Sequence, residues 1–407
     1  MKNKKKKSYY EVIGNALLLI FMLSFIFFGS DVSTNNIYRF VGIIFCVFEG
    51  LHIIKEKKLI ISPYLKTLII FFVFTIVLSY FYFKSHSGIM LSIYIFLYIG
   101  VSFMAYNFYN TIDDGREKFL KLLLYNGLII SIYVLIHYGL FNFFSLLASG
   151  KRVGQELANV NMIGLNTIIS CLIVFYYYIF HGDKKKLFYL IPLLIVSLGT
   201  GSKKVLISMI LGVLLITISK YKKNITKQSL AKFFFTFIIL IGIYIILSKI
   251  PAFETIFSRF KNLFESILKS GEFDLENRDR ANFIKYGFEV FKSNPIIGVG
   301  YGNSSKFLLL KFNYDTYFHN NYIELLATTG IIGTVLYYLS YVFSIKHNLI
   351  QLKFNENDSL SQLCLIFIII QLIIEYGMVS NQLPFIYLYM VLWNLKSHTK
   401  GMLKNDW

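Results

Sequence analysis

The feature that most constrains this chain is a series of long apolar runs that contain few charged residues. A helix needs about 20 residues to cross the hydrocarbon core of a bilayer, so runs of this kind indicate transmembrane helices. We therefore predict an all-α polytopic membrane protein with about twelve spans and a single membrane domain over residues 1–407. The expected spans lie at about 12–28, 37–54, 64–83, 89–107, 119–141, 160–180, 187–198, 205–219, 233–247, 322–345, 360–376 and 384–395.

The overall composition agrees with a membrane protein and excludes an ordinary soluble enzyme. Of the 407 residues, 56% are apolar, 18% aromatic and 15% charged, whereas a soluble domain has roughly 45–50% apolar and about 25% charged residues. The 41 Lys and Arg exceed the 22 Asp and Glu, which gives a net charge of +19. A basic balance can indicate a nucleic-acid partner, so the positions of these charges decide what they mean.

The Lys and Arg residues gather on one side of a twelve-span arrangement. Positive residues in short loops are retained on the cytoplasmic side, which predicts that both termini are cytoplasmic. Most of the net charge is then a topology signal, and we expect no nucleic-acid partner. The very basic N-terminus and the long run after it indicate a retained first anchor and no cleaved signal peptide. The residues on the predicted cytoplasmic side are Lys2, Lys4–Lys7, Lys55, Lys57, Lys58, Arg116, Lys118, Lys184–Lys186, Lys220, Lys222, Lys223, Lys227, Lys346, Lys353, Lys396, Lys400 and Lys404.

One connection is much longer than the others. Residues 248–319 separate the ninth and tenth expected spans and fall on the extracytoplasmic side. Loops longer than about 12–15 residues are usually functional or disordered. Apolar residues recur at helical spacing within 251–271, which predicts an amphipathic helix on the outer membrane surface. A second helix is expected from Arg280 to Ser293, because the residue before Pro295 is pushed out of the α region.

Four groups of cationic or titratable residues lie at the outer boundary of the predicted spans. Each alone can be explained as a snorkelling cation or a loop residue, and His319 as an interfacial residue bonded to the loop. Their location on one predicted face favours a common site, because ionisable groups near hydrocarbon are costly. Glu324 follows one turn after His319 and could orient its ring or hold a proton. The four groups are Lys151 with Arg152, Lys203 with Lys204, Arg278 with Arg280, and His319.

Other sequence patterns exclude several common enzyme classes. Gly298, Gly300 and Gly302 do not follow the G-x-G-x-x-G spacing of a dinucleotide site, and they favour a tight re-entrant turn instead. The chain has no H-E-x-x-H, G-x-S-x-G, Walker A or paired-Asp motif, so protease, hydrolase and ATPase functions lose their usual support. Three scattered cysteines in apolar runs indicate packing, and neither a disulfide nor a zinc site. We predict no cofactor and no metal.

Several segments together resemble a known family. They are the stretch from Arg280 through FEVFKSNPIIGVGYGN, then YFHNNYIELLATTGIIG, and, earlier in the chain, Arg152-x-Gly154, Asn159-x-Asn161 and TGSK ending at Lys203. In order and spacing they are similar to the O-antigen ligase and O-antigen/capsular polysaccharide polymerase family. One departure is that Lys203 and Lys204 stand where the family often has Arg, which keeps the charge and loses the bidentate guanidinium.

The resemblance implies a C-type membrane glycosyltransferase. Its donor would be an oligosaccharide on a polyprenyl diphosphate, at the outer face of the bacterial cytoplasmic membrane, with no metal required. Arg280 and His319 would be catalytic, as stabiliser of the leaving diphosphate and as general base. Diphosphate and glycan would contact Arg152, Lys203, Lys204, Arg278, Asn320 and Glu324, and sugars could stack on Tyr301, Tyr314 and Tyr317, although packing is the simpler role for each tyrosine.

Three activities are compatible with these sequence features. Residue usage rich in Lys, Ile, Asn and Phe and poor in Ala and Pro suggests a low-GC bacterium without a lipopolysaccharide core, which favours a polymerase of repeat units. A ligase that moves finished glycan to another acceptor is the alternative within the family. A flippase for lipid-linked oligosaccharide is the alternative of another class, but a transporter should concentrate charges at the midplane between repeats. Besides the lipid-linked donor and membrane lipid, the expected partners are a chain-length regulator and a flippase.

Overall fold

The structure, a computed structural model, describes residues 9–29, 36–149, 151–221 and 275–396, and within the last range the side chains from residue 280 onward. The regular elements in these ranges are helical. They are α1 (Tyr9–Phe28), α2 (Asn36–Glu56), α3 (Pro63–Val77), η1 (Leu78–Tyr82), α4 (His86–Thr111), α5 (Gly115–Ala148), α6 (Val160–His181), η2 (Lys184–Tyr189), α7 (Leu190–Gly199), α8 (Lys203–Tyr221), α11 (Leu275–Ser293), α12 (Ser304–Phe312), α13 (Asn321–Phe354), α14 (Ser359–Ile374), η3 (Glu375–Gly377) and α15 (Pro384–Asn394).

The polytopic helical class is confirmed for the part of the chain that the structure describes. Nine helices there are long and apolar enough to cross a membrane: α1, α2, α3 with η1, α4, α5, α6, α8, α13, and α14 with η3. The expected spans at 187–198 and 384–395 correspond to α7 and α15, which have only 10 and 11 residues and are too short to cross alone. The expected span at 233–247 and the expected amphipathic helix within 251–271 lie outside the described ranges. The described ranges therefore support a polytopic helical protein but not the exact number of twelve spans.

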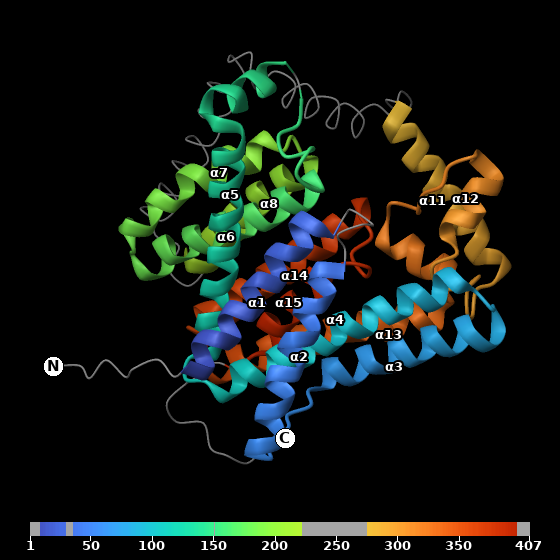
Figure 1. Cartoon of the computed structure of the whole chain (residues 1–407), viewed down its shortest axis with the longest axis horizontal. Coiled ribbons are helices and arrows are strands. Elements are labelled where there is room, and N and C mark those ends of the chain that lie inside the picture. Colours follow the sequence, from blue (N-terminus) through green and yellow to red (C-terminus); the bar gives the residue numbers. More distant parts are fainter. Residues whose placement is uncertain (1–8, 30–35, 150, 222–274, 397–407) are drawn as a thin grey trace.

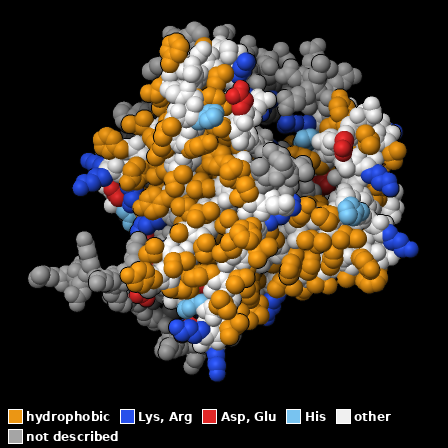
Figure 2. Space-filling view, in the orientation of Figure 1, with side chains coloured by type: hydrophobic (Ala, Val, Ile, Leu, Met, Phe, Trp, Pro, Cys, Tyr) orange, Lys and Arg blue, Asp and Glu red, His pale blue; other side chains and the backbone are white. Residues whose placement is uncertain are grey.

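The helices form one bundle in which sequence neighbours pair and distant segments also meet. In Figure 1, α3, α4 and α13 run side by side, whereas α5, α6, α7 and α8 form a second group. α1 packs on α2, α5 on α6, α14 on α8, and α11 on α13. Figure 2 shows a face on which hydrophobic side chains predominate, as expected of a surface that meets lipid. Among the described residues, exposed large hydrophobic side chains include Ile136 and Phe141, which are 75% and 86% exposed.

Short loops between antiparallel helices bring alternate helix termini to the same end of the bundle. α5 is interrupted at Gly139, which has a φ of 66°, and its residues 115–138 before this break alone span about 36 Å. Arg116 in the first turn of α5 and Arg152 just beyond its last turn therefore lie at opposite ends. We call the first the Arg116 end; it also contains Glu11, whose carboxylate pairs with Lys118 at 2.9 Å. We call the second the Arg152 end; it also contains the first residues of α6, α8 and α13.

The segment after α11 fills a break in α13. α11 ends at Ser293, as expected from Pro295. Inside α13, Gly330 has a φ of 63° and interrupts the helix. The freed backbone groups are satisfied by the preceding loop, because the Val299 and Gly300 amides donate to the Ala327 and Thr328 carbonyls at 2.9 and 3.0 Å.

The glycines of this loop permit the close approach. Gly298, Gly300 and Gly302 have φ values of 70°, 101° and 75°, so the predicted tight turn is confirmed. A Cβ at Gly298 would lie 2.5 Å from the Thr329 amide nitrogen, closer than side chains tolerate. The loop and the broken helix therefore form one unit that supports the start of α13, and His319 and Asn320 lie just before it. The short helix α12 follows this loop and was not predicted.

Candidate functional site

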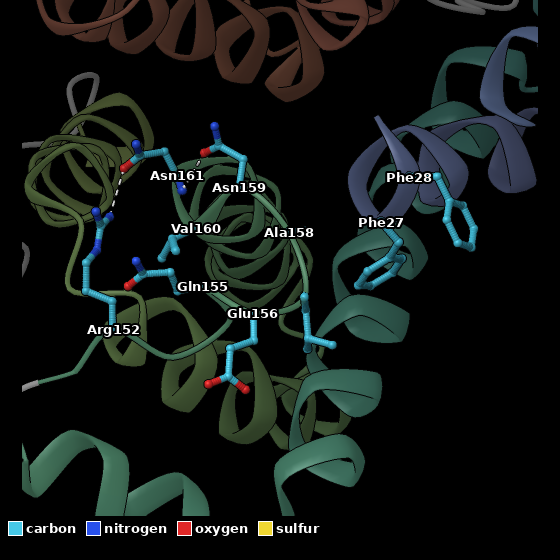
Figure 3. A pocket seen from close by; sticks show the side chains of 10 residues that line it. Phe27, Phe28, Arg152, Gln155, Glu156, Ala158, Asn159, Val160 and Asn161 are labelled. Carbon is cyan, nitrogen blue, oxygen red and sulfur yellow. Dashed lines mark hydrogen bonds between the residues drawn. The ribbon is translucent and has the colours of Figure 1, made fainter. Parts of the chain in front are cut away.

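The connection between α5 and α6 carries the first group of site residues. The Arg152 side chain donates from Nε to the Thr200 carbonyl at 2.8 Å and from a terminal nitrogen to Asn161 Oδ1 at 3.0 Å. Ser202 Oγ donates to the same Asn161 oxygen at 3.0 Å. The Arg152, Asn161 and Thr200 motifs, which are separate in the sequence, are therefore joined by direct hydrogen bonds at the Arg152 end. Figure 3 shows the bond between Arg152 and Asn161.

A cavity of about 750 Å³ opens beside this cluster. In Figure 3 the Phe27 and Phe28 rings at the end of α1 lie on one side of it, and Arg152, Gln155 and Asn161 lie on the other. Asn159 caps α6 by accepting a hydrogen bond from the Asn161 amide at 3.0 Å. The lining thus combines aromatic rings with amide side chains, a combination that can bind polyhydroxylated ligands through stacking and hydrogen bonds.

Two lysines begin α8 at the same end of the bundle. Lys203 and Lys204 occupy its first turn and are partly exposed. A Cβ at Gly377 would lie 3.2 Å from Lys204 Cε, so the Lys204 side chain passes beside the corner between α14 and α15. The N-terminus of a helix carries partial positive charge, which adds to that of the two ammonium groups. This part of the site can therefore attract an anion.

Arg280 and His319 come together across the interface of α11 and the residues before α13. Phe283 stacks on the His319 ring with centroids 6.1 Å apart and an interplanar angle of 19°. Arg280 precedes Phe283 by three residues, which places both on the same face of α11. The Tyr317 ring lies 4.3 Å from the His319 ring. Partial burial raises the pKa of Tyr317, the nearby Glu324 carboxylate adds to this rise, and the Arg280 guanidinium opposes it.

The backbone at His319 has an unusual conformation. Its φ is +56°, a left-handed value that is uncommon for residues other than glycine and often marks a functional position. His319 Nε2 lies 3.1 Å from Thr316 Oγ1. Glu324 is fully buried, and its Oε2 accepts a hydrogen bond from the Phe318 amide at 3.1 Å. Glu324 therefore shapes the turn that presents His319, through the backbone of the preceding residue.

Of the remaining predicted site residues, some are buried and others are exposed. Asn320 is buried and caps α13 by accepting from the Ile323 amide, while its Nδ2 donates to the Tyr376 carbonyl at 3.0 Å. Tyr301 is only 2% exposed and is a packing residue, so it cannot stack on sugars. Tyr314 and Tyr317 remain exposed and stay candidates for sugar contacts. Arg278 lies in α11, in the turn before Arg280, but its side chain is outside the described part.

The structure also reveals polar residues that the sequence did not single out as a site. Asn321, Glu375 and Asn381 form a buried network behind His319. A carboxylate inside an apolar span and two consecutive Asn residues after a His are the only signals that could have drawn attention to it. No group of three or more His, Cys, Asp or Glu side chains that could hold a metal ion occurs within the described ranges.

Comparison with known proteins identifies one related family. Residues 188–338 match the family model described as O-antigen ligase, which confirms the resemblance inferred from the motifs. The match includes Lys203, Arg280 and His319, whereas Arg152 precedes it. It supports a membrane enzyme that transfers glycans. No curated protein matches the chain.

Proposed function

We propose that the protein is a polysaccharide polymerase that joins oligosaccharide repeat units carried on a polyprenyl diphosphate. The observation that supports this most is the convergence of Arg280, Tyr317 and His319 within the segment that matches the O-antigen ligase family. The reaction would take place at the outer face of the bacterial cytoplasmic membrane, in the biosynthesis of a capsule, O-antigen or exopolysaccharide. Neither metal nor cofactor takes part in this proposal.

The proposed chemistry begins with the leaving group. As the bond between the anomeric carbon and the phosphate oxygen breaks, negative charge grows on the diphosphate. Preorganised cations stabilise such charge most effectively where it develops. Arg280 can bind a phosphate through paired hydrogen bonds, while Lys203 and Lys204 supply point charges at the start of α8. These groups would perform the role that a metal ion has in other glycosyltransferases.

His319 is the proposed general base. The acceptor hydroxyl oxygen forms the new bond to the anomeric carbon of the donor, and its proton passes to a His319 ring nitrogen. Thr316 Oγ1, 3.1 Å from Nε2, and the rings of Phe283 and Tyr317 fix the orientation of the imidazole. A positioned base of this kind contributes roughly 10²–10⁴ to the rate.

The cavity beside Arg152 is the proposed seat of the glycan. The amide groups of Gln155 and Asn161 can exchange hydrogen bonds with sugar hydroxyls. Phe27 and Phe28 on the opposite side provide apolar surface for a sugar face or for the first isoprene units. A site that binds both ends of the donor in this way would leave the anomeric carbon between cations and base.

Two alternatives lead to different outcomes in cells. A ligase would use the same residues with another acceptor, and a flippase would move the lipid-linked unit without forming a bond. If the protein is a polymerase, a deletion strain should accumulate single repeat units on the lipid carrier or at the surface and lose long polysaccharide, while transport of the lipid-linked unit stays intact. Accumulation on the cytoplasmic leaflet would support the flippase and contradict the polymerase. Loss of glycan from one acceptor, with long polymer still present on the carrier, would support the ligase.

The orientation of the chain is part of the proposal. We infer cytoplasmic termini from the distribution of Lys and Arg. Lys311 in α12 and Lys185 in η2 are both exposed, so single cysteines placed there form a matched pair. In intact cells an impermeant thiol reagent should label the Lys311 position and leave the Lys185 position unmodified. The reverse pattern would contradict the outer location of the site.

A further inference from the structure

A buried carboxylate lies directly behind the start of α13. Glu375, at the end of α14, is 0% exposed. Its Oε2 accepts hydrogen bonds from Tyr338 Oη at 2.7 Å and from Asn321 Nδ2 at 3.1 Å. Its Oε1 accepts from Gln371 Nε2 at 3.1 Å and from the hydroxyls of Tyr341 and Ser380. Five donors therefore converge on one carboxylate.

Asn321 extends this network to the loop between α14 and α15. Its Oδ1 accepts from the Ser380 amide at 3.0 Å, the Asn381 amide at 3.1 Å and Asn381 Nδ2 at 2.7 Å. Asn320, the preceding residue, donates to the Tyr376 carbonyl at 3.0 Å. Asn320 and Asn321, at the cap and first position of α13, thus connect the residues next to His319 to residues 375–381 through both of their side chains.

The same corner also borders the lysines of α8. Gly377 follows Glu375 by two residues, and a side chain there would contact Lys204 Cε at 3.2 Å. Residues 375–381 therefore hydrogen-bond to Asn320 and Asn321, next to His319, and also lie beside Lys204, which belongs to a distant part of the chain. A shift of this corner would change the position of the proposed base relative to the lysines.

We propose that Glu375 is a positioning residue for glycan transfer, which acts through Asn321 to hold His319 in place relative to the lysines at the start of α8. This inference rests on the proposed function. Five donors that all point at one group require an acceptor at both oxygens, and a carboxylate satisfies this requirement. A glutamine at this position would present an NH₂ group to some of these donors, so the Glu375→Gln variant should loosen the network without changing its volume.

The chain offers a matched control at the other end of the bundle. Glu49 is also a carboxylate in a membrane-spanning helix with 0% exposure, and it accepts a hydrogen bond from Tyr10. It belongs to the Arg116 end, far from His319. A general effect of neutralising a buried carboxylate should appear in Glu49→Gln as well, whereas an effect on positioning should appear only in Glu375→Gln.

The test uses full-length protein and the lipid-linked oligosaccharide extracted from the deletion strain. We expect Glu375→Gln to lower kcat by about 10- to 100-fold, the effect of a displacement of about 1 Å at the reacting groups, with KM nearly unchanged. Glu49→Gln should keep the wild-type kcat. Asn321→Ala should resemble Glu375→Gln, and the double variant should be no slower than either, because both changes break one connection.

Several outcomes would overturn the proposal. These are a folded Glu375→Gln protein with wild-type kcat, an equal loss of kcat in Glu49→Gln, or additive effects in the double variant. If Glu375→Gln does not fold, Tyr338→Phe and Ser380→Ala each remove one donor; reduced kcat at an unchanged melting temperature would support positioning, and unchanged kcat would contradict it. If wild-type protein does not convert the extracted donor at all, the proposed function fails first.

Discussion

An arginine lies near each end of α5, Arg116 in its first turn and Arg152 just beyond its last, and the two side chains have opposite environments. Arg116 is 3% exposed and donates to Ser361 Oγ at 2.9 Å and to Asn348 Oδ1 at 2.5 Å. The Asp358 carboxylate, which also caps α14, lies 3.7 Å from the guanidinium. Arg152 is partly exposed, binds the Thr200 carbonyl and borders the 750 Å³ cavity.

This contrast separates stability from function. At the Arg116 end the charge is enclosed and matched by a carboxylate, so it fastens α5, α13 and α14 and has no access to a ligand. At the Arg152 end the charge stands beside a cavity and near other cations, an arrangement suited to an anionic substrate. Changes at the first end should therefore affect folding, and changes at the second should affect turnover.

The largest effect should come from Arg116→Ala. Removal of one partner leaves Asp358 buried and unmatched, which typically costs about 3–5 kcal/mol. We expect a clear fall in the melting temperature of purified protein in detergent, or loss of folded protein. The partly exposed i,i+4 pair of Lys121 and Glu117 gives the control: Lys121→Ala should change stability by at most about 1 kcal/mol. Similar melting temperatures for both variants would contradict the stabilising role assigned to Arg116.

His319→Ala should affect rate and leave folding intact. Loss of the proposed general base should lower the transfer rate by roughly 10²–10⁴. Donor binding should be largely retained, because His319 is not assigned to the diphosphate. Single-turnover kinetics and binding of extracted donor would measure the two properties. A stable His319→Ala protein with the wild-type rate would exclude the assigned role even if the family is right.

Arg280→Lys should also lower the transfer rate, but by less than His319→Ala. Lys restores the charge but lacks the bidentate geometry, and loss of one charge-assisted hydrogen bond costs about 1.5–3 kcal/mol, or about 10- to 100-fold in rate. Unlike His319→Ala, this variant should also bind the donor more weakly. Full activity of Arg280→Lys would show that charge alone suffices at this position.

Chelation should have the smallest effect. The proposed site meets the diphosphate with Arg280, Lys203 and Lys204, so we expect activity in excess EDTA to equal activity in its absence. Purified protein dialysed against chelator provides the measurement, with re-addition of Mg²⁺ or Mn²⁺ as the control. A strict requirement for either ion would remove the arginine and lysines from the role proposed for them.

The helical membrane class and part of the site could be predicted from the sequence because they depend on local patterns. Apolar runs predicted the spans, and Pro295 predicted the end of α11. The family motifs indicated that Arg152 and Thr200 belong to one site, and their hydrogen bond agrees with this. Arg116 was interpreted only as a marker of topology, since nothing near it in the sequence reveals Asn348 or Asp358 as partners.

Other features depend on contacts between distant segments and could not be predicted. The break in α13 at Gly330 is stable because a loop some thirty residues earlier supplies the missing hydrogen bonds. The run at 384–395 was predicted as a span, but α15 has only 11 residues, and the loop before it enters the bundle to meet Asn321. For Glu375 the sequence showed a carboxylate in an apolar run, and its donors come from α13, from α14 and from the loop before α15.

The most direct test of the account is a transfer reaction with purified wild-type protein in lipid vesicles or detergent. Lipid-linked oligosaccharide extracted from the deletion strain would be the substrate, and glycan length and released polyprenyl diphosphate would be measured together. We predict that each lengthening of the glycan by one repeat unit releases one polyprenyl diphosphate, and that His319→Ala protein with an unchanged melting temperature does this at least about 10²-fold more slowly. Movement of the lipid-linked unit across the vesicle membrane with no new glycosidic bond would contradict the account.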